Sequence, residues 1–219
     1  MKICKIKGLL AVLLVSLLSS CSETRTEIKT IKPISSAQSD ISEGYSAAKS
    51  KDYKTAISLF NVSIGKNPSI PEAYYYRGKA YQKLNKIEAA KKDYFKALEV
   101  NMKYPEVHNS LGVLYTSQGD YRDAIDSYTV AISFNPNYDK PYINRGVVYF
   151  REGSYRKALF DFTRALEINP GSALALKNRA NVYIRLGATS ALCGDLKQLC
   201  DLGNCKSYNK LSNSKICKK

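Results

Sequence analysis

The sequence lacks most of the features that mark an enzyme or a metal protein. It contains a single histidine, His108, at a place where packing is a better explanation than acid–base chemistry. It has no glycine-rich phosphate loop, no nucleophile elbow and no isolated pair of carboxylates. Its cysteines lack the close Cys-x-x-Cys spacing of zinc sites and thiol oxidoreductases. We therefore expect no catalysis, no cofactor and no metal ion.

Long hydrophobic runs are also scarce. The main apolar stretch, Gly8–Leu18, is too short to cross a bilayer comfortably, and it follows Lys2, Lys5 and Lys7. A basic start followed by a short apolar core is typical of an export signal. We expect residues 1–20 to be a signal peptide that is removed.

The residues at the end of this segment, Leu18-Ser19-Ser20-Cys21, resemble a bacterial lipobox. An ordinary secretory cleavage site beside a chance cysteine is the alternative. The resemblance implies that Cys21 becomes the first residue and carries acyl chains such as palmitate, which anchor a lipoprotein to a membrane of the bacterial cell envelope. Ser22 in place of aspartate implies the outer membrane, facing the periplasm, if the source is Gram-negative. Residues 21–36 would then be the lipidated cysteine and a flexible tether.

The chain is strongly basic. Its formal net charge is +15, and loss of the three lysines in the signal segment leaves +12. Such a charge favours nucleic acid or an anionic surface as partner. Export and the lack of a DNA- or RNA-binding motif argue against nucleic acid, so anionic lipid, an acidic envelope polymer or an acidic protein fits better.

A 34-residue period runs through most of the chain. Small residues, aromatic residues and prolines recur in separate columns, although Met102 replaces one proline. The columns are Gly44, Gly78, Gly112, Gly146 and Ala180; Tyr81, Tyr115, Tyr149 and Tyr183; Ala56, Ala90, Ala124 and Ala158; Phe60, Tyr94, Tyr128 and Phe162; and Pro68, Pro136 and Pro170. Glycine and alanine at such positions allow two helices to approach closely.

This pattern resembles the tetratricopeptide repeat (TPR), a helix-turn-helix unit of 34 residues. The resemblance implies an all-α fold, a right-handed superhelix of about five repeats with a disulfide-stapled cap at its C-terminal end. We place a TPR domain at 37–204 and a C-terminal capping tail at 205–219. The repeats are 37–70, 71–104, 105–138, 139–172 and 173–204.

An arginine at the seventh position of a repeat accompanies an aspartate at the twenty-third. The pairs are Arg77 with Asp93, Arg145 with Asp161, and Arg179 with Asp195, whereas repeat three has Leu111 and Ser127 and loses both. We infer an ion pair between the two helices of these repeats, worth at most ~1 kcal/mol if exposed. The same register predicts a second helix at 191–200 in repeat five.

In this family the first helix of each repeat lines a concave groove through its positions 2, 5, 6, 9, 12 and 13. We predict a peptide-binding groove that includes Tyr75, Tyr76, Lys79, Lys83, Asn109, Lys140, Asn144, Arg151, Lys177, Asn178 and Arg185. The three asparagines can each donate to and accept from a peptide backbone. Cations at position 13 form a basic stripe, or they favour the helix dipole, and the two explanations are compatible.

Two functions remain open. The first is a membrane-anchored adaptor or scaffold that binds envelope proteins or peptide segments in the groove. The second is direct binding of a non-protein envelope ligand, peptidoglycan or anionic lipid, by the basic surface. The positions of the carboxylate clamp found in chaperone-binding relatives do not match, so that use is not supported.

Four cysteines lie close together near the C-terminus of a chain that we expect to be exported, where disulfides are the default. Cys193 and Cys200 are seven residues apart on one helix, about 10.5 Å by helical rise, which exceeds the limit of ~7 Å for a disulfide. We favour Cys200 with Cys205 across a turn, and Cys193 with Cys217 through a tail that runs back over repeat five. The sequence alone does not fix this connectivity.

Overall fold

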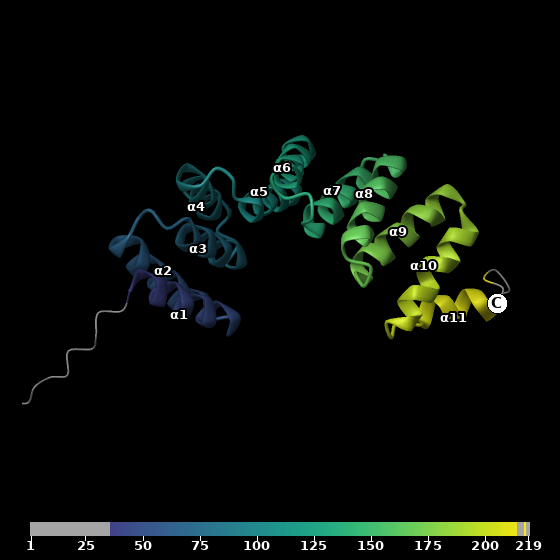
Figure 1. The fold of residues 1–219 in the computed structure, drawn as a ribbon, viewed down its shortest axis with the longest axis horizontal. Coiled ribbons are helices and arrows are strands. Elements are labelled where there is room, and N and C mark those ends of the chain that lie inside the picture. The colour runs from purple at the N-terminus through teal and green to yellow at the C-terminus, as the bar shows by residue number, and fades with distance from the viewer. Residues whose placement is uncertain (1–35, 214–216, 218–219) are drawn as a thin grey trace, which may run out of the picture. The chain divides into compact units, whose positions relative to one another are not determined.

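The structure is a computed structural model that describes residues 36–213 and Cys217. Residues 1–35, which hold the predicted signal peptide, Cys21 and nearly all of the tether, lie outside this part. Every regular element in the described part is an α-helix (Figure 1). None of the helices described is long and apolar enough to span a bilayer.

Ten of these helices form five hairpins in the predicted register. The first helices of the hairpins are α1 (Ala37–Lys49), α3 (Pro71–Lys83), α5 (Pro105–Gln118), α7 (Asp139–Arg151) and α9 (Ala173–Leu186). The second helices are α2 (Tyr53–Lys66), α4 (Ile87–Val100), α6 (Tyr121–Phe134), α8 (Tyr155–Ile168) and α10 (Thr189–Asp201). Each second helix begins at the seventeenth residue of its repeat, so the 34-residue period is preserved in space.

The turn inside each hairpin uses a left-handed residue at the fifteenth position. Glycine fills this place in the last three repeats, as Gly119, Gly153 and Gly187. Lys51 and Asn85 adopt the same positive φ, at 64° and 57°. Glycine is the residue that takes this conformation without a steric cost, so lysine at this turn is strained by ~1–2 kcal/mol.

Each of the first four hairpins is closed by an aromatic ring packed on a glycine. A Cβ atom at Gly112 would lie 2.5 Å from a ring carbon of Tyr128, and one at Gly146 would lie 2.8 Å from Phe162. Gly44 and Gly78 face Phe60 and Tyr94 in the same way. Repeat five has an alanine in the glycine column and Leu196 in place of the ring. The glycine column and the aromatic column therefore change together, because the side chains at the two positions fill the same space between the helices.

The three predicted arginine–aspartate pairs are all present. Arg145 donates to both carboxylate oxygens of Asp161, from Nε at 2.9 Å and Nη2 at 2.8 Å. The Asp161 side chain is only 1% exposed, and those of Asp93 and Asp195 are 5% exposed. These are buried, bidentate ion pairs, so the small value expected for an exposed pair does not apply.

The same arginines also bind the preceding repeat, which the sequence analysis did not foresee. Nη1 of Arg145 donates to the hydroxyl of Thr129 on α6 at 2.8 Å. Arg77 reaches Asn61 on α2 at 2.7 Å, and Arg179 reaches Thr163 on α8 at 3.3 Å. Each arginine therefore ties three helices together.

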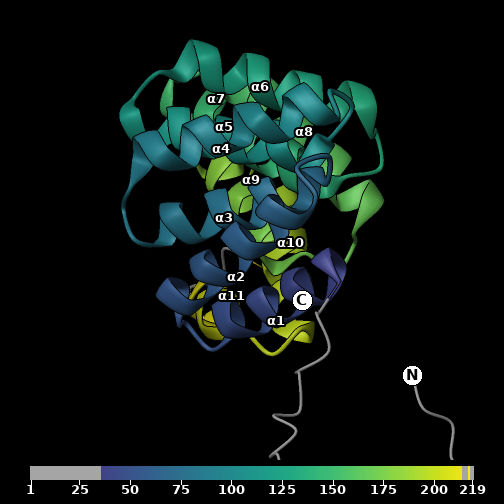
Figure 2. The same ribbon diagram turned by 90° about the vertical axis from the view of Figure 1, so that its left-hand side faces the viewer.

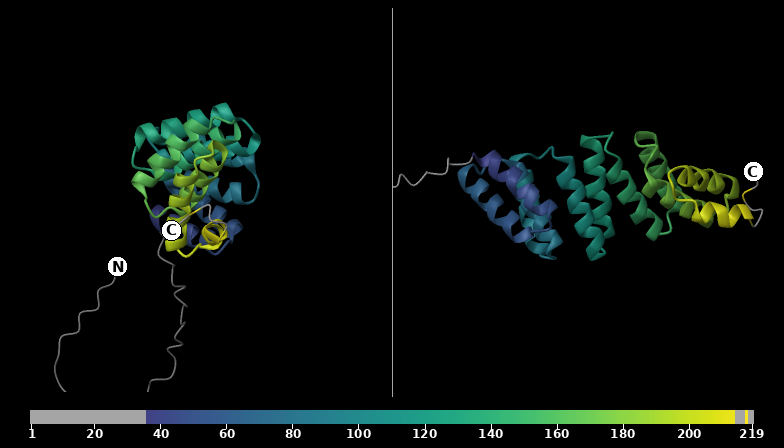
Figure 3. Two further views of the ribbon diagram at one scale, coloured as in Figure 1. Left: turned by 90° about the vertical axis from the view of Figure 1, so that its right-hand side faces the viewer. Right: turned by 90° about the horizontal axis from the view of Figure 1, so that it is seen from below.

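Successive hairpins pack side by side, as the end-on view and the view from below both show (Figures 2 and 3). The junction between repeats two and three differs from the others. There α4 packs less closely against α5 than α2 does against α3, α6 against α7 or α8 against α9. This is also the junction without the arginine link, since Phe95 and Leu111 occupy its two positions.

The C-terminal tail forms a further helix, α11 (Lys206–Asn213), where the sequence analysis predicted only a returning tail. Tyr208 packs against the apolar core of repeats four and five. Disulfides join Cys193 to Cys217 and Cys200 to Cys205, the pairs favoured from the sequence. The end of the array is thus covered by a short helix that is stapled on both sides.

Candidate functional site

The predicted groove residues all lie on the first helices α3, α5, α7 and α9. Their cationic members share two properties: they are exposed, and they form no ion pair with any described acidic residue. These cations are Lys79, Lys83, Lys140, Arg151, Lys177 and Arg185. Lys49, at the end of α1, has the same two properties. The face of the first helices is therefore a basic surface without internal neutralisation.

Tyr75 differs from the expectation of a ligand-facing residue. It is only 8% exposed, and its ring packs against those of Tyr76 and Tyr104, with centroids 5.1 and 5.3 Å away. Burial raises the pKa of Tyr75 to about 12, and a hydrogen bond with Ser110 partly opposes this rise. Tyr75 therefore packs beneath neighbouring tyrosines and is not exposed to a ligand.

The asparagines also differ from one another. The side-chain amide of Asn144 donates to the side-chain oxygen of Asn109 at 2.9 Å, which joins α7 to α5. Asn109 is 9% exposed, so it offers little to a ligand. Asn144 is half-buried and its side-chain oxygen is left for a ligand, while Asn178 is half-buried and its amide has no hydrogen-bond partner among the described residues. Asn178 is thus the asparagine that best fits the predicted role.

Two polar residues at groove positions are already hydrogen-bonded to tyrosines of the same hairpin. Tyr94 donates its hydroxyl to Gln82 at 3.0 Å, and the hydroxyls of Tyr128 and Thr116 lie 3.1 Å apart. Where the ring is a phenylalanine, the residue at this groove position is apolar, as with Phe150 opposite Phe162. These side chains complete the hairpin core and are not free for a peptide.

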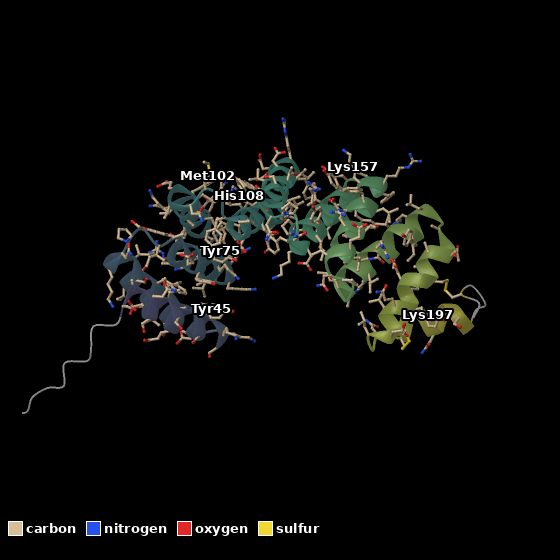
Figure 4. The ribbon with its side chains drawn as sticks, in the orientation of Figure 1. Tyr45, Tyr75, Met102, His108, Lys157 and Lys197 are labelled. Carbon is tan, nitrogen blue, oxygen red and sulfur yellow. A yellow bond between two sulfur atoms is a disulfide. The ribbon has the colours of Figure 1, made fainter. Side chains whose placement is uncertain are left out.

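The best-formed hollow on this face lies between α1 and α3, around Tyr45 and Tyr76. Their rings are 5.3 Å apart and tilted by 59°, and Tyr45 is 44% exposed. A pocket of about 220 Å³ is lined by Tyr45, Ala48, Lys49, Tyr53, Tyr76, Lys79, Ala80 and Lys83. A second, of about 250 Å³, shares the two rings and is lined by Gln38, Ile41, Ser42, Tyr45, Glu72 and Tyr76. Figure 4 labels Tyr45 and Tyr75 in this region.

Lysines surround the first of these pockets. Lys49 Nζ lies 5.7 Å from the centre of the Tyr45 ring, and Lys79 Nζ lies 5.3 Å from that of Tyr75. Burial lowers the pKa of Lys79, and the like charges of Lys140 and Lys83 lower it further. The aromatic faces attract the ammonium groups, but no carboxylate of residues 36–213 forms an ion pair with them. The pocket therefore combines apolar walls with unmatched positive charge.

Sequence reasoning missed several residues of this region. Tyr53 begins α2 and lies outside the groove columns, so no signal identified it. Tyr104 and Tyr138 are the residues just before α5 and α7, and burial raises the pKa of both hydroxyls. Gln38 and Ser42 do occupy groove columns of repeat one, and extending those columns to α1 would have found them.

Other clusters in the described part offer little chemistry. No group of three or more histidine, cysteine, aspartate or glutamate side chains there has the geometry of a metal site. His108 packs against Phe134, and its Nε2 lies 3.0 Å from the carbonyl oxygen of Met102 (Figure 4). Opposite the groove, α4 and α8 expose Phe95 and Phe160 among lysines and arginines.

Comparison with known proteins agrees with the repeat geometry. The family described as "TPR repeat" matches residues 112–153, and that described as "Tetratricopeptide repeat" matches 71–101 and 140–172. No curated protein sequence matches the chain significantly.

Solved structures with the same fold are numerous. Pseudomonas aeruginosa PilF is 16% identical over 81% of this chain and 91% of that chain, with a TM-score of 0.72. PilW, described as a widely conserved type IV pilus biogenesis factor, is 17% identical over 84% and 94%, with a TM-score of 0.68. YrrB, described as a TPR protein with an unusual peptide-binding site, is 20% identical over 81% and 92%, with a TM-score of 0.60.

TPR proteins bind protein partners such as peptides and generally act as non-enzymatic scaffolds. The period, the glycine–ring packing, the family matches and the structural neighbours all agree. The chain is a tetratricopeptide-repeat protein.

Proposed function

We propose that the protein is an adaptor that is anchored to a bacterial envelope membrane and binds an extended segment of an envelope protein in its groove. The observation that carries this proposal is the face of the first helices. It presents unpaired cations and two adjoining hollows around Tyr45 and Tyr76, whereas buried cations elsewhere are matched by carboxylates. Exposed charge without an internal partner is a common feature of binding surfaces.

Two structural neighbours support a role of this kind. PilW is described as a pilus biogenesis factor, and YrrB as having a peptide-binding site. A peptide-binding site in a protein of this fold shows that the fold can hold a segment of another chain. We extend this use to the present chain, without choosing a particular envelope machine.

Export and anchoring are supported by the sequence and by the cysteines. The lipobox-like residues Leu18–Cys21 follow a basic, apolar segment. The two disulfides of the C-terminal end suit an oxidising compartment outside the cytosol. Replacement of Cys21 by serine should abolish incorporation of labelled palmitate and release the protein from membranes. Continued acylation of the Cys21→Ser variant would contradict lipidation at this residue.

Capture of the partner tests the adaptor role. Protein crosslinked in its native membranes would be purified as wild type, as a groove variant and as a variant of the opposite face. The groove variant carries Asn144→Ala and Asn178→Ala; the control carries Lys92→Ala and Arg156→Ala, both exposed on second helices. We expect one or a few envelope proteins to be enriched by wild type and control, and lost by the groove variant.

Other outcomes have defined meanings. Absence of any enriched envelope protein would overturn the adaptor proposal. Loss of the partner only in the control variant would move the site to the opposite face. Recovery of peptidoglycan or anionic lipid instead of protein, with steep dependence on salt, would favour the non-protein ligand.

A further inference from the structure

The lysines beside the tyrosine hollow differ from the cations that this protein pairs with its own aspartates. Lys66, Arg77, Arg145 and Arg179 each meet an aspartate whose side chain is at most 5% exposed. Lys79 is exposed and its ammonium group lies over the ring of Tyr75, but no described carboxylate reaches it. Lys49 and Lys83 lie close by, in the last turns of α1 and α3. A ligand with negative charges would provide what this group lacks.

The hollow itself favours an apolar group. Tyr45, Tyr53 and Tyr76 form its walls, and its volume of about 220 Å³ is below the 300–1,000 Å³ typical of pockets for whole small-molecule ligands. One large side chain, aliphatic or aromatic, is the occupant that fits such a space. The tyrosine rings would contact it with their faces while their hydroxyls remain near water.

The second hollow has an acidic residue in its lining, whereas the first is surrounded by lysines. It lies on the other side of the Tyr45–Tyr76 pair and is lined by Gln38, Ser42 and Glu72. Glu72 is in the first turn of α3, whereas Lys83 is in its last turn. Eleven residues of helix separate them, a rise of about 16 Å, which an extended chain of about five residues would span.

We propose that this site recognises an extended protein segment with a basic residue, a central apolar anchor and an acidic cluster, in that order or the reverse. The anchor enters the hollow between Tyr45 and Tyr76. The acidic cluster meets Lys49, Lys79 and Lys83, and the basic residue meets Glu72. This inference rests on the proposed adaptor function and specifies the chemistry of its partner.

The probe is a blocked seven-residue peptide, Lys-Ser-Ser-Phe-Ser-Asp-Asp, together with its reversed sequence, because charge alone does not set the chain direction. Binding to the full-length protein in detergent would be measured by titration calorimetry at low ionic strength. Two matched peptides replace phenylalanine by serine or both aspartates by asparagine. We expect at least one direction to bind and each replacement to weaken binding at least tenfold.

Variants of the protein locate the site. Lys79→Glu with Lys83→Glu should weaken binding of the acidic peptide at least tenfold and create binding of a peptide with lysines in place of its aspartates. Lys92→Glu with Arg156→Glu is the matched control, because it reverses two exposed cations that lie on second helices, outside the groove. Both lysines are exposed, so circular dichroism should show an unchanged fold.

The outcomes separate this inference from the adaptor proposal. No binding of either peptide at millimolar concentration, or equal weakening by Lys92→Glu with Arg156→Glu, would overturn the inference, while partner capture by the wild type would leave the adaptor role intact. Displacement of the peptide by phosphatidylglycerol vesicles would also count against it, since a headgroup would then be the better ligand. Failure of capture with successful peptide binding would point to a site whose cellular role is not that of an envelope adaptor.

Discussion

Repeat four contains Arg145 and Asp161 and follows Thr129 of the repeat before it, whereas repeat three contains Leu111 and Ser127 and follows Phe95. In repeat four the arginine binds the aspartate through two nitrogens and the threonine through a third. In repeat three Leu111 is buried and no such link exists. Both hairpins nevertheless pack an aromatic ring on a glycine in the same way.

The comparison separates two structural roles within one repeat, that of the glycine–ring contact and that of the arginine. The glycine–ring contact closes a hairpin, since it is present with and without the arginine. The arginine adds a connection to the preceding repeat, and the junction that lacks it is the least closely packed. In arrays of this kind stability is approximately the sum of the stabilities of single repeats and of the interfaces between neighbouring repeats. The contributions of the two contacts can therefore be measured separately.

The largest expected effect comes from Arg145→Leu, which leaves Asp161 buried without its partner. Loss of one member of a buried pair typically costs ~3–5 kcal/mol. Urea unfolding, with hydrogen exchange to localise the loss to α7 and α8, would measure it. Lys96→Leu, which breaks an exposed pair with Glu99, is the control and should cost at most ~1 kcal/mol. Equal losses of unfolding free energy in the two variants would show that burial of the ion pair does not determine the cost of breaking it.

The same variant should depend on pH. Burial raises the pKa of Asp161, and the hydrogen bonds from Arg145 oppose this rise. Without Arg145 the folded-state pKa rises further above the unfolded value, so the folded protein holds the proton more tightly. Stability is then greatest below the unfolded pKa and falls as pH rises through the folded pKa. The penalty for Arg145→Leu should be smaller at pH 4 than at pH 8.

The second effect concerns the contact that both repeats share. Gly112→Ala would place a Cβ atom 2.5 Å from the Tyr128 ring, and such overpacking typically costs ~1–3 kcal/mol. Adding Tyr128→Leu reproduces the alanine–leucine combination of repeat five and should recover part of the loss. Gly65→Ala is the control, because nothing lies within 4 Å of its Cβ position in α2. A loss at Gly65 as large as that at Gly112 would contradict the steric explanation.

A smaller effect distinguishes the polar ring of repeat three from the apolar ring of repeat four. Tyr128→Phe removes the hydrogen bond to Thr116 and should cost ~0.5–1.5 kcal/mol. Thermal unfolding would measure the loss. Thr116 also donates to the Gly112 carbonyl, so its hydroxyl is not left unpaired. An increase in stability for Tyr128→Phe would show that the hydroxyl pair has no value here.

The smallest effect is expected when repeat four is converted to the chemistry of repeat three. The triple change Thr129→Phe, Arg145→Leu and Asp161→Ser removes both charges together, and such replacements are often neutral within ~1 kcal/mol. Hydrogen exchange should nevertheless speed up in the middle of α7, around residue 145, where the link to α6 is lost. A loss as large as that of Arg145→Leu alone would mean that the ion pair itself stabilises the repeat. The loss in Arg145→Leu would then not come from leaving Asp161 buried and unpaired.

The fold could be predicted almost completely from the sequence, because a 34-residue period constrains many positions at once. The periodic columns located both helices of the first four repeats, and the arginine–aspartate correlation identified three contacts across helices and the second helix of repeat five. The third arginine bond was missed because its partner changes between asparagine and threonine, Asn61, Thr129 and Thr163, and so forms no obvious column. The helix α11 was missed because it lies beyond the last repeat.

The candidate site was predictable only as a set of surface positions. A column states which face a residue occupies, but not whether its neighbours leave it accessible. Tyr75 is covered by Tyr76 and Tyr104 of its own repeat, and Asn109 is bound by Asn144 of the next repeat. The hollow at Tyr45 depends on Tyr53, which belongs to a second helix. Such combinations of neighbours require the three-dimensional arrangement.

The arginine bond across repeats limits how this array could grow by gene duplication. A tandem copy of residues 71–104 would set the copied arginine opposite Phe95, which offers no oxygen. A tandem copy of 139–172 would set it opposite Thr163, which already binds Arg179 in this way. A duplicated repeat therefore keeps the link only where the second helix before it offers an oxygen to its arginine. Insertions that meet this condition should be accepted most readily towards the C-terminal side of the array.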